Sequence, residues 1–213
     1  MTLKVYSAAE ERINIGSHAL GLALSTVALL LLILKTLPYN NTIYTLSFSV
    51  FGASLICLYL ASTLYHSAKT QQARTRLRIV DHATIYILIA GTYTPFCLIT
   101  LAGPAGWIIF TVSWSLAVIG VALKLFFTGH FERLSTLMYV FMGWIVIFVV
   151  KPMIESLPPE GLAWLVAGGL SYTLGAVIYS IKKIPFNHAI FHGFVLAGSV
   201  CHFISVYLYV LPP

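Results

Sequence analysis

The chain has 213 residues, of which 59% are hydrophobic and only 8% are charged. Soluble domains carry about 25% charged residues, so this composition excludes a water-soluble fold and indicates an integral membrane protein. The net charge of +6 is dispersed between apolar stretches instead of gathered on one segment, so no nucleic-acid partner is expected.

Long stretches without charge divide the chain into membrane spans. A spanning helix needs about 20 mostly apolar residues. Each stretch holds one helix except 82–123, which is twice that length and is broken by the sequence AGPAG at 102–106. The sequence therefore predicts a single domain, 1–213, folded as an all-α seven-transmembrane helix bundle. The expected spans are about 14–34, 43–66, 81–101, 106–126, 134–151, 161–181 and 187–210.

The basic residues indicate the orientation of these spans. Of the 12 Lys and Arg residues, only Lys35 and Lys151 fall on one side of the predicted bundle, and the others fall on the N-terminal segment and on the second, fourth and sixth loops. Loops rich in Lys and Arg stay in the cytoplasm. We therefore expect a cytoplasmic N-terminus and a C-terminus outside.

The first residues are amphipathic and carry two acids, Glu10 and Glu11. They suggest a short interfacial helix before the first span. His18 is expected to be a hydrogen-bonded packing residue and not a ligand. No disulfide is expected from the three cysteines, which all fall within spans: Cys57, Cys97 and Cys201.

The second and third spans bring polar residues to the cytoplasmic side. Ser62 and His66 are four residues apart at the end of the second span, so they share one face of a helix. Asp81 opens the third span and is the only aspartate in the chain. Two interpretations of it stay open: a charge favoured at a helix N-terminus and paired with Arg78, or a general base. His82 is rotated by about 100° from Asp81 and is expected to face elsewhere.

The seventh span carries three histidines. We expect Pro185 in its first turn and Asn187 as its cap. His188 and His192 are four residues apart and share one helical face, which is a spacing typical of metal ligands. His202 is expected about 15 Å deeper, on a different face and in a packing role.

The predicted topology places these groups in one layer of the membrane. The second span ends, and the third and seventh begin, at the cytoplasmic side, so His66, Asp81 and His188 lie within a few helical turns of the same surface. Three neutral imidazoles with a free position for water are typical of a catalytic zinc site, although iron or another transition metal also suits them. In this interpretation Asp81 takes a proton from the water, and Ser62 holds the water or stabilises an oxyanion.

The ordered set Ser62-x-x-x-His66, Asp81 and His188-x-x-x-His192 resembles the progestin and adipoQ receptor family, specifically its bacterial haemolysin III branch. ERINIGSHALG near the start and LAGSVCHF after the last motif extend the resemblance over the whole chain. The resemblance implies one zinc ion held by His66, His188 and His192, with Asp81 and Ser62 around the metal-bound water. It also implies a multi-pass protein of the bacterial plasma (inner) membrane, similar to the alkaline ceramidases of the wider superfamily, which cleave lipid amides.

Three functions follow as hypotheses. The first is a zinc-dependent hydrolase of an amide or ester bond in a membrane lipid, with a role in membrane lipid homeostasis. The second is a non-enzymatic sensor or receptor of lipids or of the membrane state, in which zinc is structural. The third is a pore-forming, haemolysin-like protein, although the sequence shows no polar stripe through the bilayer that would support it.

Overall fold

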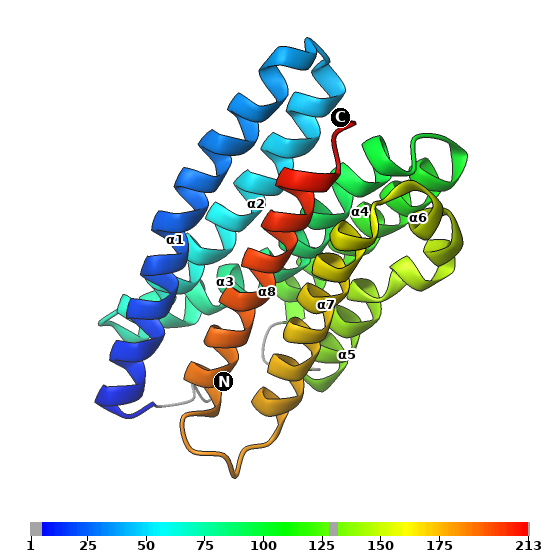
Figure 1. Cartoon of the computed structure of the whole chain (residues 1–213). Helices are drawn as coiled ribbons and strands as arrows, with labels where there is room; N and C mark the ends of the chain where they lie inside the picture. Colours follow the sequence, from blue (N-terminus) through cyan, green and yellow to red (C-terminus); the bar gives the residue numbers. More distant parts are fainter. Residues whose placement is uncertain (1–5, 128–131, 213) are drawn as a thin grey trace.

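The computed structural model describes residues 6–127 and 132–212, and the regular structure within these ranges is helical. Among the described residues, seven helical segments are long and apolar enough to cross a membrane, which confirms the predicted architecture. Figure 1 labels the helices, which are α1 (Ala8–Thr36), α2 (Thr42–Ser67), α3 (Gln71–Pro95), α4 (Pro104–Phe127), α5 (Glu132–Gly143), α6 (Val150–Ser156), α7 (Pro159–Ser180) and α8 (Asn187–Tyr209).

The last span packs against the first. Helices α1 to α4 pack in sequence order, α7 packs along α8, and α8 also lies against α1. Figure 1 shows that α1 begins and α8 ends at opposite ends of the bundle. By contrast, α5 touches α3, α4 and α7 only sparsely. The close-packed helices therefore form one side of the bundle and the loosely packed α5 forms part of the other.

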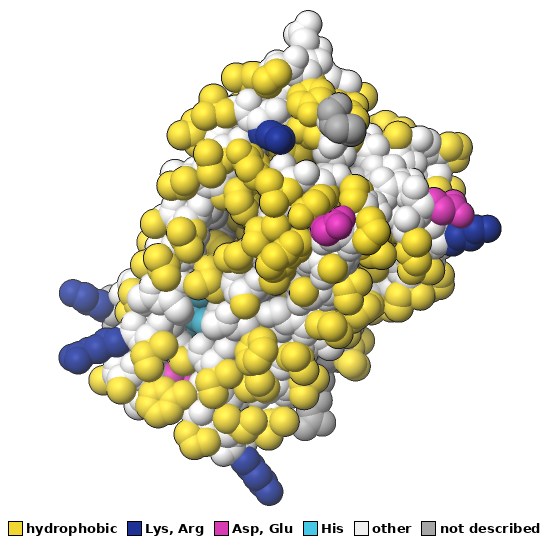
Figure 2. Space-filling model, viewed as in Figure 1, with side chains coloured by type: hydrophobic (Ala, Val, Ile, Leu, Met, Phe, Trp, Pro, Cys, Tyr) yellow, Lys and Arg dark blue, Asp and Glu magenta, His cyan; other side chains and the backbone are white. Residues whose placement is uncertain are grey.

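The outer surface suits contact with lipid. Figure 2 shows hydrophobic side chains over most of the visible face, with few charged side chains among them. Large apolar side chains such as Phe126 and Phe148 are 77% and 75% exposed. Such a surface is stable in hydrocarbon and not in water, so the chain is a multi-pass membrane protein. Its orientation in the membrane remains a prediction.

The first helix is longer than the sequence suggested. We expected a separate interfacial helix before the first span, and this expectation is wrong, because α1 runs unbroken from Ala8 to Thr36. Ser7 caps it, since the Ser7 hydroxyl accepts a hydrogen bond from the backbone N–H of Glu10 at 3.1 Å. With no proline or loop in the segment, Glu10 and Glu11 belong to the spanning helix itself.

The fifth span is broken, whereas we expected one continuous helix over about 134–151. Helix α5 ends at Gly143, and a 3-10 turn at Ile145–Val149 leads into α6. The Tyr93 hydroxyl donates to the Gly143 carbonyl at 2.9 Å and accepts from the Val146 amide at 3.0 Å. A membrane helix tolerates a break where other groups satisfy the freed backbone atoms. Tyr93 on α3 therefore makes this break possible.

Helix α8 begins differently from what we expected. Phe186, in the left-handed region at φ 55°, precedes the helix, and Pro185 lies in the turn before it instead of in its first turn. Asn187 is the first helical residue, and its amide donates to the carbonyls of Tyr179 (3.0 Å) and Ile181 (3.4 Å). Asn187 is not the cap, because its side chain satisfies free carbonyls at the end of α7. This contact positions the start of α8.

Candidate metal centre

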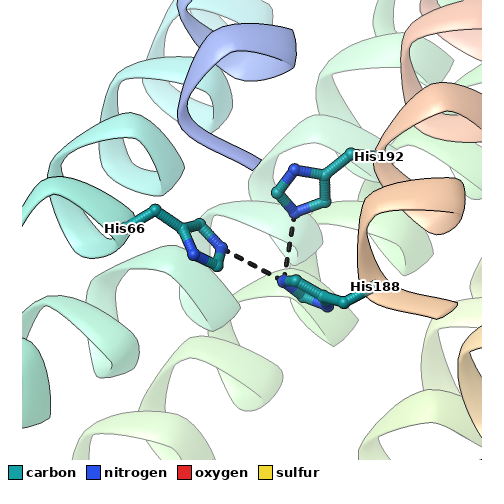
Figure 3. Close-up of side chains that lie close together, drawn as sticks. All are labelled: His66, His188 and His192. Carbon is teal, nitrogen blue, oxygen red and sulfur yellow. Dashed lines mark hydrogen bonds between the residues drawn. The ribbon is translucent and has the colours of Figure 1, made fainter. Parts of the chain in front are cut away.

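Three histidines from two helices meet at one end of the bundle. His66 lies in the last turn of α2, and His188 and His192 lie in the first two turns of α8. The Nε2 atom of His188 is 3.1 Å from Nε2 of His66 and 3.1 Å from Nε2 of His192 (Figure 3). All three side chains are buried, and one ligand atom of each lies within 4.8 Å of the others. This group is called the trihistidine cluster below.

The cluster has the geometry of a metal site. Zn–N bonds of about 2.0–2.1 Å in a tetrahedron place two ligand nitrogens about 3.3–3.4 Å apart, so the two 3.1 Å separations are close to what zinc requires. A neutral imidazole has one N–H, so a ring that binds metal through Nε2 carries its hydrogen on Nδ1. These three buried histidines could therefore hold a metal ion.

Glu11 fixes the outer nitrogen of one cluster residue. Its carboxylate oxygen lies 2.7 Å from Nδ1 of His66, and the amide of Asn14 donates to the same carboxylate at 3.2 Å. Arg74 from α3 pairs with the other oxygen. Because a carboxylate accepts a hydrogen bond, it holds the hydrogen of His66 on Nδ1 and leaves the Nε2 lone pair directed at the cluster.

This role of Glu11 was not predicted from the sequence, where the residue was expected in an interfacial helix. A signal was present: Glu11, Asn14 and His18 recur at three and four residues and so share a face of α1. A polar face on a spanning helix indicates contact with a buried polar site.

His18 packs on the cluster itself. Its ring is stacked on His192 with 3.5 Å between centroids, and it meets the Tyr59 ring edge-on at 5.1 Å. We expected a hydrogen-bonded packing residue, and only the packing is found, because neither ring nitrogen has a hydrogen-bond partner among the described residues. Ser17, beside it, lies 3.4 Å from Nδ1 of His192 through its hydroxyl. Helix α1 therefore contributes to the surroundings of both α2 and α8 histidines.

Ser62 and Asp81 lie on the wall of a cavity that His188 and His192 also line. Both are buried, and the Ser62 hydroxyl is hydrogen-bonded to the Asp81 carboxylate. Arg78 is close enough for its charge to act on Asp81. The structure thus places a carboxylate and a hydroxyl in the wall of the same cavity as two of the cluster histidines.

Three tyrosine rings surround the cluster on other sides. Tyr6, which precedes α1, is stacked on His188 at 4.8 Å with an interplanar angle of 20°. Tyr65 lies 4.6 Å from His66, and Tyr179 lies 5.5 Å from His188. Burial raises the pKa of the Tyr6 phenol, so this ring is neutral where it covers the cluster. The aromatic rings limit access to the histidines from the end of the bundle where α1 begins.

The cavity is about 280 Å³ in volume and extends from the cluster into the core of the bundle. Its lining comes mainly from α3, α5, the 3-10 turn, α7 and α8, with one or two residues each from α1, α2, α4 and α6. Most of the lining side chains are aliphatic or aromatic. A largely apolar cavity with a smaller number of polar groups in its wall is typical of a ligand site.

Two histidines that we expected to face away also line this cavity. His82 does so next to Asp81, because the cavity borders a wide face of α3. His202 lies 14 residues after His188, which is almost four full turns, so the two differ by only about 40° around α8. His202 is about 80° around α8 from His192, as the expected difference in face implied, but its position relative to His188 brings it to the same cavity. As expected, His202 is not part of the trihistidine cluster.

The fold and this site together define a seven-span membrane protein with a candidate metal centre beside an internal, largely apolar cavity. The family model described as "Haemolysin-III related" matches residues 6–203, and the chain therefore belongs to that family. This confirms the resemblance seen in the motifs.

Curated relatives support the same assignment. The chain is 44% identical over 212 residues to Hemolysin-3 of Bacillus cereus, which covers 100% of this chain and 97% of the relative. It is 44% identical over 205 residues to the Hemolysin-3 homolog of Bacillus subtilis (strain 168), which covers 96% of each. The human Monocyte to macrophage differentiation factor is a more distant relative, 28% identical over 166 residues, or 75% of this chain and 68% of the relative.

Proposed function

We propose that the protein is a zinc-dependent hydrolase that cleaves an amide or ester bond of a lipid in the bacterial plasma (inner) membrane, with a role in membrane lipid homeostasis. The main support is the position of the trihistidine cluster, which borders an apolar cavity together with Asp81 and Ser62. The cavity suits the chain of a lipid, and the polar end suits the bond to be cleaved.

Zinc is the metal that this set of side chains favours. The three converging groups are imidazoles, which suit zinc and other transition metals and not magnesium or calcium. Catalytic zinc sites commonly have three protein ligands. When bound, zinc would supply Lewis-acid chemistry, since it lowers the pKa of water and polarises a carbonyl group.

The residues of the protein would then have separate roles in the hydrolysis. The apolar walls hold the lipid chain and exclude bulk water, so that the amide or ester carbonyl lies beside His188 and His192. Asp81 accepts a proton from water as the water oxygen bonds to the acyl carbon. The same carboxylate returns that proton to the leaving amine or alcohol as the C–N or C–O bond breaks. Ser62 orients the Asp81 carboxylate through their hydrogen bond.

Two substitutions test this proposal. Asp81→Asn removes the proton acceptor but keeps the side-chain shape, so hydrolysis of a short-chain ceramide by the purified protein should fall about 10²–10⁴-fold. Zinc content, measured by inductively coupled plasma mass spectrometry, should stay unchanged in that variant. His192→Ala should lose zinc, and His202→Phe, which changes another buried histidine of α8, should keep it. Full zinc occupancy in His192→Ala would contradict the metal centre.

A sensor with a structural metal is the second candidate. It is favoured by the way the cluster joins α2 to α8, while Glu11 and Arg74 connect His66 to α1 and α3. A metal here would fasten four helices. Two results would support the sensor. The zinc-loaded wild-type protein would hydrolyse neither ceramide nor an ester analogue, and the Asp81→Asn variant would have unchanged stability.

A further inference from the structure

The far end of the cavity has a polar group of its own. His202 lines the cavity ten residues after His192 on the same helix, which corresponds to a distance of about 15 Å along α8. Its side chain is 6% exposed and thus almost completely enclosed by the bundle. Neither the metal centre nor the proposed hydrolysis uses it.

The hydrogen bonding of His202 determines which of its nitrogens is free. Nδ1 lies 2.8 Å from the carbonyl oxygen of Gly198. Because a carbonyl can only accept, Nδ1 carries the N–H, and in the neutral imidazole Nε2 is then an acceptor with a lone pair. The ring is held in place by stacking on Tyr172 at 5.3 Å and by α7, where Gly168 leaves just enough room for it.

Several other polar side chains of the cavity wall have partners within the protein. The Tyr172 hydroxyl is 2.9 Å from that of Ser199, and the Trp144 indole donates to Thr173 at 2.9 Å. The Tyr93 hydroxyl is already used at the break between α5 and α6. Among the described residues, none donates a hydrogen bond to Nε2 of His202. Nε2 is not among the fully enclosed side-chain atoms that lack a partner, so it is open to the cavity that the ring lines, and an occupant of that cavity can donate a hydrogen bond to it.

We propose that His202 forms a second binding subsite, which accepts a hydrogen bond from a hydroxyl or amide N–H carried along the chain of the lipid in the cavity. This inference rests on the proposed function only in that a lipid occupies the cavity. The preferred ligand is an amphiphile with a polar head at the trihistidine cluster and a hydrogen-bond donor about 15 Å away, which is the spacing of His192 and His202 along α8. A chain without such a donor leaves Nε2 unpaired and binds less tightly.

A matched pair of probes tests the subsite. Binding of ω-hydroxydodecanoic acid and of dodecanoic acid is measured by isothermal titration calorimetry on the full-length protein in lipid nanodiscs, both zinc-loaded and after treatment with EDTA. The wild type should bind the hydroxy acid about tenfold more tightly, which corresponds to one net hydrogen bond. His202→Phe keeps a stacking ring but removes the acceptor, so it should bind both acids equally. His202→Gln restores an acceptor and should recover part of the preference.

The control is Ser205→Ala. It removes a buried hydrogen bond from Ser205 to the Gly161 carbonyl, 2.7 Å long, that joins α8 to α7 without lining the cavity. It should keep the preference for the hydroxy acid even if it is less stable. Equal binding of the two acids by the wild type, or an unchanged preference in His202→Phe, overturns the subsite. If neither acid binds the wild type, the lipid site of the proposed function fails as well. If the EDTA-treated protein has lost zinc but still prefers the hydroxy acid to dodecanoic acid, the proposal of the subsite holds.

Discussion

Glu11 acts on the cluster through His66 and not as a ligand of its own. Glu11→Gln removes the charge that holds the His66 N–H in place, so zinc affinity should fall about 10–100-fold. Competition with a chromophoric chelator measures this affinity, and the d–d spectrum of the cobalt-substituted protein should change with the geometry of His66. Glu11→Asp should restore part of the affinity.

The matched control is Glu155→Gln, which changes an exposed carboxylate of α6. It should bind zinc like the wild type. If Glu11→Gln does so too, the contact between Glu11 and His66 is structural and does not position the ring.

The sequence predicts which residues lie close together mainly where their spacing along one helix determines it. His188 and His192 share a helical face by their spacing alone, and the topology placed His66 and Asp81 near them. The hydrogen bond between Glu11 and His66 spans 55 residues, so it depends on how α1 packs beside α2. No local pattern gives that packing, although the polar face of α1 was visible in the sequence.

Among the helices, the break between α5 and α6 depends most clearly on one side chain. Tyr93→Phe would leave the Gly143 carbonyl and the Val146 amide without their hydroxyl partner, which should cost about 1–3 kcal/mol of stability. Thermal unfolding in detergent measures the loss. Zinc content should not change, because Tyr93 is far along α3 from Asp81.

Tyr39→Phe is the control for this prediction. It removes an equally good hydrogen bond, 2.7 Å from the Tyr39 hydroxyl to the Pro212 carbonyl, at an exposed end of the bundle. Water can replace that contact, so the variant should unfold close to the wild-type temperature. An equal effect of both substitutions would show that Tyr93 has no special role at the break.

Helix number was easier to predict than helix shape. Bilayer thickness requires about 20 apolar residues per span, so composition alone separates seven of them. Where a helix bends or ends is decided by partners elsewhere, as with Tyr93 for α5 and with the α7 carbonyls for Asn187. The apolar sequence around Gly143 is compatible with an unbroken helix, and only the tertiary contact decides against it.

For the molecule as a whole, the orientation predicted from the basic residues can be measured directly. Single cysteines at Thr42 and Gln72, which are exposed at the starts of α2 and α3, mark the two ends of the bundle. In a background without the three free native cysteines, we expect a membrane-impermeant maleimide to label Thr42→Cys in spheroplasts and to label Gln72→Cys only after lysis. The reverse pattern would place the trihistidine cluster at the outer surface.

Tyr6 is positioned to control the rate at which a metal ion leaves the trihistidine cluster. Its ring is stacked on His188, and the residue precedes the Ser7 cap and so lies outside the turns of α1. A cover of this kind changes exchange rates more than it changes affinity. Tyr6→Ala should therefore lose zinc to EDTA at least tenfold faster at a similar dissociation constant, while Tyr6→Phe, which keeps the ring, should exchange like the wild type. Equal release rates in all three proteins would mean that the Tyr6 ring does not control the path by which the metal enters and leaves.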